Sequence, residues 1–184
     1  MKITSGLYKF KKIDIIKAIN LRPTSNKVRQ AFFNILSNRY NWKFLYKDSH
    51  LLDAFSGSGI ITIEAFSRNL SKATLIEEDK KIFKVLENNI SKFKLLNKVN
   101  LIRSNFFDID LEKNAYNLVF LDAPYNKDIN NKAINKILDE KSLRKDSILA
   151  CESEKNYKFK NIFLKYIDLT KTYGKTSITF FKFS

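Results

Sequence analysis

The sequence predicts an α/β fold with a mostly parallel, Rossmann-like sheet of seven strands that ends in an antiparallel hairpin. From residue 50 onwards, short apolar runs alternate with amphipathic helical patterns. One apolar run passes through a glycine-rich turn directly into a helical pattern, which is typical of folds that bind nucleotide cofactors. Two β-like stretches close the chain around Tyr173-Gly174-Lys175, a pattern that favours a hairpin added to a parallel sheet.

The elements are expected in a simple order. A small hairpin over residues 2–13 turns around Ser5-Gly6, and a linker then leads to a helix over residues 26–38. The later elements follow from apolar runs for strands and apolar stripes for helices. They are strand 50–54, helix 58–70, strand 73–77, helix 79–94, strand 99–103, strand 117–121, helix 129–140, strand 146–151, and strands 161–169 and 176–183.

Composition places the chain among globular proteins. Its 184 residues suit one domain with a small appendage, and 44% of them are hydrophobic. Runs of about 18 uncharged apolar residues are absent, so no membrane span is expected. The single cysteine, Cys151, fits a reducing compartment, and the basic first twelve residues lack the apolar core of a signal peptide. We therefore expect a cytoplasmic protein.

The positive charge is concentrated near the start of the chain. Residues 1–47 hold eleven Lys or Arg and one acid, a net charge of +10, out of +15 for the whole chain. Such asymmetry favours an N-terminal extension that contacts a polyanion, most simply nucleic acid. An AT-rich genome would also enrich lysine, although it would not place the lysines in one region. We expect a basic extension over residues 1–47 and a catalytic domain over residues 48–184.

The glycine-rich turn indicates the class of cofactor. An apolar strand ends in Asp53, and Gly57 and Gly59, two of only four glycines in the chain, follow at once. A dinucleotide site requires a third glycine, but that position is Thr62. A carboxylate ahead of the turn repels phosphate and suits a ligand with an amine and ribose hydroxyls. The pattern favours S-adenosyl-L-methionine over a dinucleotide.

Two further strand ends carry candidate cofactor residues. Glu77 directly follows the second strand, where a carboxylate can accept hydrogen bonds from both ribose hydroxyls. The alternative is that Glu77, Glu78 and Asp79 form an acidic cluster at a helix start, and Asp79 is expected to cap that helix. Asn105 follows the third strand, where its amide can pair with an adenine edge; an ordinary turn asparagine is the alternative.

The fourth strand is followed by Asp122-Ala123-Pro124-Tyr125. The Asp122 carboxylate and the Ala123 carbonyl can accept hydrogen bonds from the amino group of a planar base. Tyr125 can stack on a base that has been flipped out of its helix. Methyl transfer from a sulfonium needs mainly positioning. A turn of this composition is also common on protein surfaces. Its position after a glycine-turn unit is what favours a base-binding role over an ordinary surface turn.

Several segments together resemble the RsmD family of 16S rRNA (guanine-N2)-methyltransferases, with the class I methyltransferase fold. The turn at Asp122 resembles the (D/N)-P-P-(Y/F) signature of amino-group methyltransferases. The likeness covers nearly the whole chain, in order. Its segments are MKITSGLYKFKKI, LRPTSNKVRQAFFNIL, LLDAFSGSGIITIEAFSR, ATLIEEDKK, VFLDAPY, ACESEKN and KTYGKTSITFF.

The resemblance implies a role for each matching residue. The methionine part of the cofactor would contact Asp53, Phe55, Gly57 and Gly59, while the ribose and adenine would contact Glu77 and Asn105. The target base would contact Asp122, Ala123, Pro124 and Tyr125. RNA would contact Arg22, Thr24, Lys27 and Arg29, together with Lys9 and Lys11 of the basic hairpin. No metal is expected. The partner would be small-subunit rRNA within assembled or assembling 30S subunits, bound by a monomer.

Two positions differ from the family pattern. Ala123 stands where the family usually has the first proline of the catalytic turn. The backbone carbonyl is kept, but the rigidity of proline is lost, which costs about 0.4–1 kcal/mol through the entropy of the unfolded chain. Phe10 stands where family members usually have a glycine in the hairpin. Three rival functions stay open: a DNA or RNA adenine-N6 amino-methyltransferase, a non-catalytic RNA-binding assembly factor, and a nicotinamide oxidoreductase, which the absent third glycine disfavours.

Overall fold

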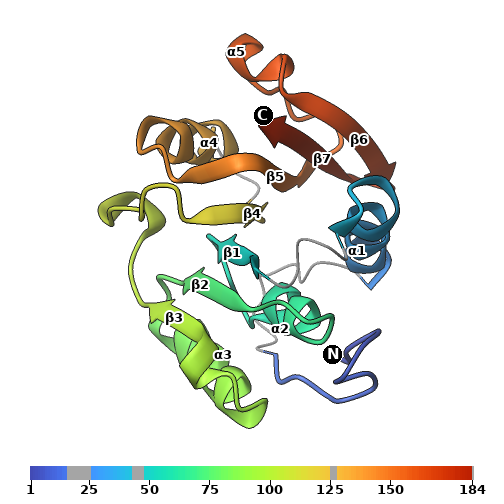
Figure 1. Ribbon diagram of the computed structural model, residues 1–184, viewed down its shortest axis with the longest axis vertical. Helices are drawn as coiled ribbons and strands as arrows, with labels where there is room; N and C mark the ends of the chain where they lie inside the picture. Colours follow the sequence, from blue (N-terminus) through green and yellow to red (C-terminus); the bar gives the residue numbers. More distant parts are fainter. Residues whose placement is uncertain (16–25, 43–47, 125–127, 184) are drawn as a thin grey trace.

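The computed structural model describes residues 1–15, 26–42, 48–124 and 128–183. A seven-stranded sheet runs through the centre of the molecule in the order β3-β2-β1-β4-β5-β7-β6 (Figure 1). Its strands are β1 (His50–Asp53), β2 (Lys72–Ile76), β3 (Val99–Ile102), β4 (Tyr116–Leu121), β5 (Leu143–Glu154), β6 (Ile167–Tyr173) and β7 (Thr176–Phe183). The predicted strand number and C-terminal hairpin are therefore confirmed.

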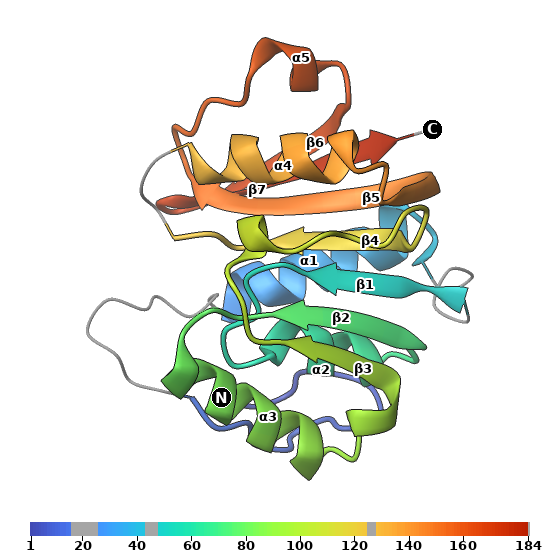
Figure 2. The same ribbon diagram turned by 90° about the vertical axis from the view of Figure 1, so that its left-hand side faces the viewer.

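Strands β1 to β5 are parallel, and β7 pairs antiparallel with both β5 and β6. The parallel strands all point towards one edge of the sheet, at the left of Figure 2. The chain order reverses between β1 and β4, which are neighbours in the sheet. In open α/β sheets, ligands bind outside the carboxyl ends of the strands at such a reversal. The glycine-rich turn follows β1 at this point.

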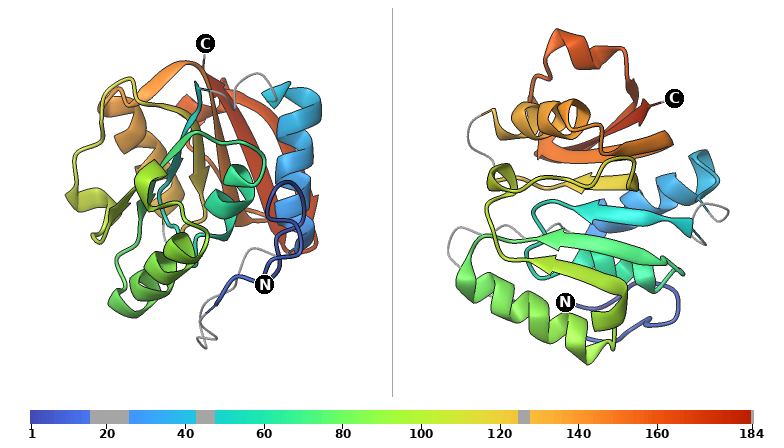
Figure 3. Two further views of the ribbon diagram at one scale, coloured as in Figure 1. Left: turned by 60° about the horizontal axis from the view of Figure 1, so that its bottom comes forward. Right: turned by 60° about the vertical axis from the view of Figure 1, so that its left-hand side comes forward.

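Helices cover both faces of the sheet. They are α1 (Asn26–Arg39), α2 (Ile60–Phe66), α3 (Lys80–Lys92), α4 (Ile129–Asp139) and α5 (Asn161–Leu164), with 3₁₀ turns η3 (Leu96–Lys98) and η4 (Phe106–Asp108). Side chains of α1, α2 and α3 share one apolar cluster with one face of the sheet, and those of α4, α5 and η4 share the second cluster. The left panel of Figure 3 shows α4 and α1 on opposite sides of the strands.

The N-terminal hairpin packs against the core. A bridge joins Lys2 to Lys12, and Ile3 and Ile13 belong to the same apolar cluster as α1 and α2. Its turn lies against the last residues of α2 and α3, because Leu7 N donates to Ser67 O (2.8 Å) and Tyr8 Oη to Phe93 O (3.4 Å). Both helices begin at the carboxyl edge of the sheet, so the hairpin turn lies near the opposite edge (Figure 2).

One predicted element is partly wrong. Residues 161–169 were expected to form a strand, but Asn161–Leu164 form helix α5 and β6 begins only at Ile167. Of the three apolar residues of α5, Phe163 is buried in the core. Ile162 is 58% exposed and Leu164 is 50% exposed. In the part of the chain described here, no helix is long and apolar enough to cross a bilayer.

Candidate active site at the carboxyl ends of β1, β2 and β4

The turn after β1 requires its two glycines. Gly57 and Gly59 have φ angles of 53° and 78°, in the left-handed region that side chains disfavour. A Cβ on Gly59 would lie 2.6 Å from Leu86 Cδ1, whereas a Cβ on Gly57 would meet no atom within 4 Å. Gly59 therefore permits close packing of α2 on α3, and the space beside Gly57 is open to a ligand.

The turn is joined to the neighbouring strand through Ser56. Its hydroxyl donates to Asp53 O (2.7 Å) and accepts from Ile76 N (3.0 Å), while its own amide donates to Ile76 O (2.9 Å). The ends of β1 and β2 are thereby held together, and the residue after Ile76 is brought to the glycine turn.

That residue is Glu77. Its carboxylate accepts hydrogen bonds from Gly57 N (3.0 Å) and Asp79 N (2.9 Å). Burial raises its pKa, and the two amide donors partly oppose this effect. Asp79 caps α3 by accepting from Lys81 N and Ile82 N, as expected. Glu77 is thus an oriented acceptor beside the glycines, with lone pairs left for a ligand.

Asp53 is a buried acid with a perturbed pKa. Only 2% of the residue is exposed, and its Oδ2 accepts a hydrogen bond from Thr62 Oγ1 (2.7 Å). Burial raises its pKa to about 7, Thr62 lowers it, and the charges of Asp122 and Glu77 raise it further. Thr62 stands where a dinucleotide-binding fold has its third glycine. The hydrogen bond from its hydroxyl to Asp53 gives a reason for a threonine at this position.

Asp122 lies close to this acid because β1 and β4 are neighbours. Asp53 pairs with Phe120 in the register, so Asp122 stands two residues beyond that pair. Asp122 is half-buried and Ala123 is buried, while Pro124 is exposed. Tyr125 lies outside the described residues. The structure therefore brings the glycine turn and the turn after β4 to one edge of the sheet, as the sequence predicts.

Asn105 takes part in a turn. Its Oδ1 accepts from Phe107 N (2.9 Å), which caps η4, and its Nδ2 donates to Glu78 Oε2 (2.7 Å). The side chain is exposed, next to the carboxyl end of β3. The next residue, Phe106, is buried, and its ring centroid lies 5.5 Å from that of Phe55. The two rings form an apolar wall, to which Phe55 contributes the more accessible face.

The residues expected to contact RNA differ in their exposure to solvent. Lys9, Lys11 and Lys27 are exposed, and Arg22 and Thr24 lie outside the described residues. Arg29 is a correction: it is 0% exposed and pairs with Glu64 (Nε–Oε1 3.1 Å), so it has no surface for a phosphate. Burial lowers its pKa, although Glu64 opposes this effect.

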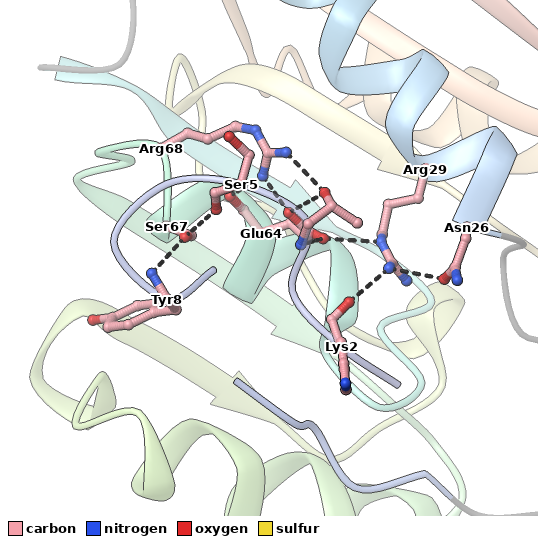
Figure 4. A network of polar contacts seen from close by, with 9 residues as sticks. Lys2, Ser5, Tyr8, Asn26, Arg29, Glu64, Ser67 and Arg68 are labelled. Atoms are coloured by element: carbon pink, nitrogen blue, oxygen red, sulfur yellow. Dashed lines mark hydrogen bonds and ion pairs between the residues drawn. The ribbon is translucent and has the colours of Figure 1, made fainter. Parts of the chain in front are cut away.

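Arg29 belongs to a buried polar network that sequence reasoning missed (Figure 4). Arg29 donates to Lys2 O (2.9 Å), and Glu64 accepts from Thr4 N (2.7 Å) and pairs with Arg68. The network joins the hairpin, α1 and α2. A glutamate inside the apolar helix sequence IITIEAF, with an arginine four residues later, was the available signal.

Phe10 adopts a left-handed backbone conformation, which favours glycine. Its φ is 69°, and its amide donates to Ile3 O (2.9 Å). The side chain is 70% exposed, with Lys9 Nζ 4.8 Å from the ring centroid. The turn is therefore kept, and the phenylalanine occupies it in a strained backbone conformation.

Asn89 of α3 links the N-terminal extension to the glycine turn. Its Nδ2 donates to both Asp14 O and Ser58 O (2.9 Å each), and its Oδ1 accepts from Asp14 N (3.0 Å). The asparagine is 0% exposed. One buried amide thus holds the segment after the hairpin against the turn between Gly57 and Gly59.

Known proteins resemble this chain over most of its length. A family model described as conserved hypothetical protein 95 matches residues 1–182. A relative from Buchnera aphidicola (Acyrthosiphon pisum), named ribosomal RNA small subunit methyltransferase D, is 38% identical over 155 residues, which are 83% of this chain and 78% of the relative. The protein of the same name from Escherichia coli K12 is 31% identical, over 84% of this chain and 75% of its own.

Solved structures confirm the fold. A putative methyltransferase, yhhF, from Escherichia coli superimposes with a TM-score of 0.82 at 26% identity, covering 100% of this chain and 98% of its own. An RNA methyltransferase from Salinibacter ruber, solved with S-adenosyl-L-homocysteine, gives a TM-score of 0.63 at 20% identity, over 88% of this chain and 93% of its own, a likeness of fold alone. The chain belongs to the conserved hypothetical protein 95 family, the RsmD family of methyltransferases.

Proposed function

We propose that the protein transfers a methyl group from S-adenosyl-L-methionine to the exocyclic N2 amine of a guanine in small-subunit rRNA. The observation that carries the proposal is the gathering of Asp53, Glu77 and Asp122 at the carboxyl ends of three strands, around a glycine turn. The names of the relatives support rRNA as the substrate. The family and a structural neighbour crystallised with S-adenosyl-L-homocysteine support the cofactor.

The residues at the glycine turn fit this cofactor. The space beside Gly57 accommodates a ligand that a side chain would otherwise obstruct, and the free lone pairs of Glu77 suit the two ribose hydroxyls. Asp53 provides a buried acceptor for the amine of the methionine part, and the exposed face of Phe55 provides an apolar wall. Asn105 would have to exchange its hydrogen bond to Glu78 for one to adenine. S-adenosyl-L-methionine supplies a methyl group on a positively charged sulfur.

The turn after β4 would hold the target base. The Asp122 carboxylate and the Ala123 carbonyl accept hydrogen bonds from the amino group, which leaves the nitrogen lone pair directed at the methyl donor. Pro124 and Tyr125 are proposed to contact the ring, Tyr125 by stacking. Positioning of this kind supplies most of the rate when the methyl donor is already activated.

The basic N-terminal extension, residues 1–47, is proposed to bind rRNA outside the pocket of the methyltransferase domain, residues 48–184. Lys9, Lys11 and Lys27 present exposed charges, and Arg22 and Thr24 are proposed contacts next to the site. Neutralised phosphates make such binding steeply dependent on salt. We propose that the protein acts as a cytoplasmic monomer on assembled or assembling 30S subunits.

The test supplies a labelled methyl donor and undermethylated small subunits, followed by digestion of the RNA to nucleosides. Label in N2-methylguanosine is the expected result. Label in N6-methyladenosine, or incorporation into DNA instead of subunits, would overturn the substrate assignment. Absence of any transfer, with calorimetric binding of the cofactor intact, would instead favour an assembly factor.

A matched pair of variants tests the catalytic turn. Asp122→Asn should abolish measurable methylation while the Kd for S-adenosyl-L-methionine stays within about threefold, because a cofactor bound mainly at the turn after β1 does not need this carboxylate. Asp139→Asn changes an exposed acid at the end of α4 and should leave both quantities unchanged. Equal activity of the two variants would remove Asp122 from the mechanism.

A further inference from the structure

A pocket of about 390 Å³ opens beside the carboxyl end of β5, away from the glycine turn. Its volume lies within the range of small-molecule sites, about 300–1,000 Å³. Side chains from the end of β5, the segment after it and the β6–β7 hairpin line it. They include Ser153, Lys155, Tyr157, Lys158, Phe159 and Thr170.

The pocket is a neighbour of the catalytic turn. Leu121 of β4 pairs with Cys151 of β5, so Asp122-Ala123-Pro124 follows β4 at the level where the last residues of β5 still pair with β7. Neighbouring strands lie about 4.8 Å apart. The segment after the turn also contacts the pocket wall, because the Tyr157 hydroxyl lies 3.5 Å from Asp128 Oδ1. A strand of RNA bound at the turn after β4 would have this pocket on its β5 side.

The rim of the pocket is positively charged. Residues 155–165 hold four lysines and no acid, and Lys155 and Lys158 of this segment line the pocket with one acid, Glu154. All three side chains are exposed. A phosphate group at the rim would be attracted by both lysines.

One wall of the pocket is aromatic and fixed. The rings of Tyr157 and Phe159 lie 4.9 Å apart at 65°, and Phe159 packs against Phe181 (5.0 Å) in the core. The Tyr157 hydroxyl accepts a hydrogen bond from Asn131 N (3.1 Å), which fixes the ring on the start of α4. Thr170 and Thr179 also line the pocket, and their hydroxyls bond to each other (3.1 Å). Lysines, rings and hydroxyls match the phosphate, base and ribose of a nucleotide.

We propose that this pocket binds one unpaired nucleotide of the rRNA strand, next in sequence to the target guanine. The proposal rests on the proposed function, and it extends that function to a second contact. A base that is flipped out for chemistry must have its backbone held on at least one side. The pocket provides that contact on the β5 side of the catalytic turn, opposite the cofactor on the β2 side.

The principal variant is Thr170→Trp, which fills the pocket without changing charge. Thr170 is exposed on β6, an edge strand where an aromatic residue is well tolerated. We expect the KM for undermethylated small subunits to rise about tenfold, the size expected for the loss of one stacked base. The Kd for S-adenosyl-L-methionine should stay within twofold. Asn100→Trp, at an exposed position of β3 on the other edge, is the matched control and should leave KM unchanged.

A second pair of variants tests the rim. Lys155→Ala/Lys158→Ala should raise the same KM and lessen its dependence on salt, whereas Lys141→Ala/Lys145→Ala, at the opposite end of β5, should not. A KM within twofold of wild type for Thr170→Trp, in a variant with an unchanged melting temperature, would overturn the proposal. Filter retention measures how tightly the wild type and Thr170→Trp bind the subunits, and this measurement does not require catalysis. The proposal for the pocket and the proposed methyl transfer are therefore tested independently of each other.

Discussion

Arg29 of α1 and Glu64 of α2 form an ion pair, Nε to Oε1 at 3.1 Å, in which neither side chain is exposed. Glu64 also accepts a hydrogen bond from Thr4 N, and its second oxygen pairs with Arg68. Two cations and a backbone amide thus surround one buried carboxylate. The pair attaches the first helix and the hairpin to the helix that follows the glycine turn.

Removal of one partner of this pair should be costly. Arg29→Met leaves part of the Glu64 charge uncompensated in the core, and we expect it to lower the free energy of unfolding by about 3 kcal/mol. Arg29→Met/Glu64→Leu should recover part of this loss, because no charge is then buried in the pair. Urea unfolding of the single and double variants measures both values.

The exposed pair between Arg39 and Asp168 is the control. Its side chains are 49% and 28% exposed and lie 2.7 Å apart. Because solvent screens such a pair, Arg39→Met should lower the free energy of unfolding much less than Arg29→Met does. A comparable loss for both arginine variants would show that burial does not set the cost.

Cofactor affinity should depend on pH through Asp53. Burial raises its pKa to about 7, so in the free protein this carboxyl is largely protonated at pH 6 and largely ionised at pH 8. A cationic amine binds the ionised form, so the Kd for S-adenosyl-L-methionine should fall about tenfold between pH 6 and pH 8 after correction for the ligand's own titration. Calorimetry at a series of pH values measures it. Asp53→Asn should remove this dependence, and an unchanged profile in that variant would assign the titration to another group.

The same shift predicts a trend in stability. The pKa of Asp53 is that of an ordinary aspartate, 3.8, in the unfolded chain and about 7 in the folded protein. Between these values the folded state holds a proton that the unfolded state has released, so this group makes stability fall as pH rises from about 4 to 7. Chemical unfolding at several pH values, with Asp53→Asn as reference, isolates the contribution.

The proposed contact of Glu77 with the ribose is tested by Glu77→Gln, with Glu78→Gln as the matched control. Glu77→Gln replaces an acceptor held by two backbone amides beside the glycine turn, and we expect the Kd for S-adenosyl-L-methionine to rise about tenfold or more. Glu78→Gln alters an exposed side chain that accepts only from Asn105 among the described residues, and should change the Kd less than threefold. Equal effects would contradict the assignment.

Phe10→Gly should stabilise the protein. The φ of 69° is costly for phenylalanine and free for glycine, and the ring is 70% exposed, so little buried area is lost. We expect a gain of about 1 kcal/mol in the free energy of unfolding. Leu7→Gly, at a 75% exposed neighbour without a positive φ, should have the opposite sign, and a loss of stability in both variants would argue against backbone strain at Phe10.

Local patterns predicted most of the fold because each strand and helix has its own periodicity. The pattern fails at Asn161–Leu164, where three apolar residues in a row fit a strand and a helical turn equally well and tertiary packing of Phe163 decides. The meeting of Asp53, Glu77 and Asp122 could be predicted because parallel strands end at one edge. The role of Arg29 could not, since its partner Glu64 lies 35 residues away and meets it only after α1 packs on α2.

Asn89 joins the glycine turn to the segment that follows the hairpin. It holds Ser58 of the glycine turn with the same amide nitrogen that holds Asp14, immediately before the segment with the proposed RNA contacts. The two bonds use separate N–H groups of one amide, so a displacement of either segment that rotates the Asn89 side chain also disturbs the bond to the other segment. Asn89 is therefore one physical connection through which the proposed cofactor site and the proposed RNA contacts can influence each other's affinity.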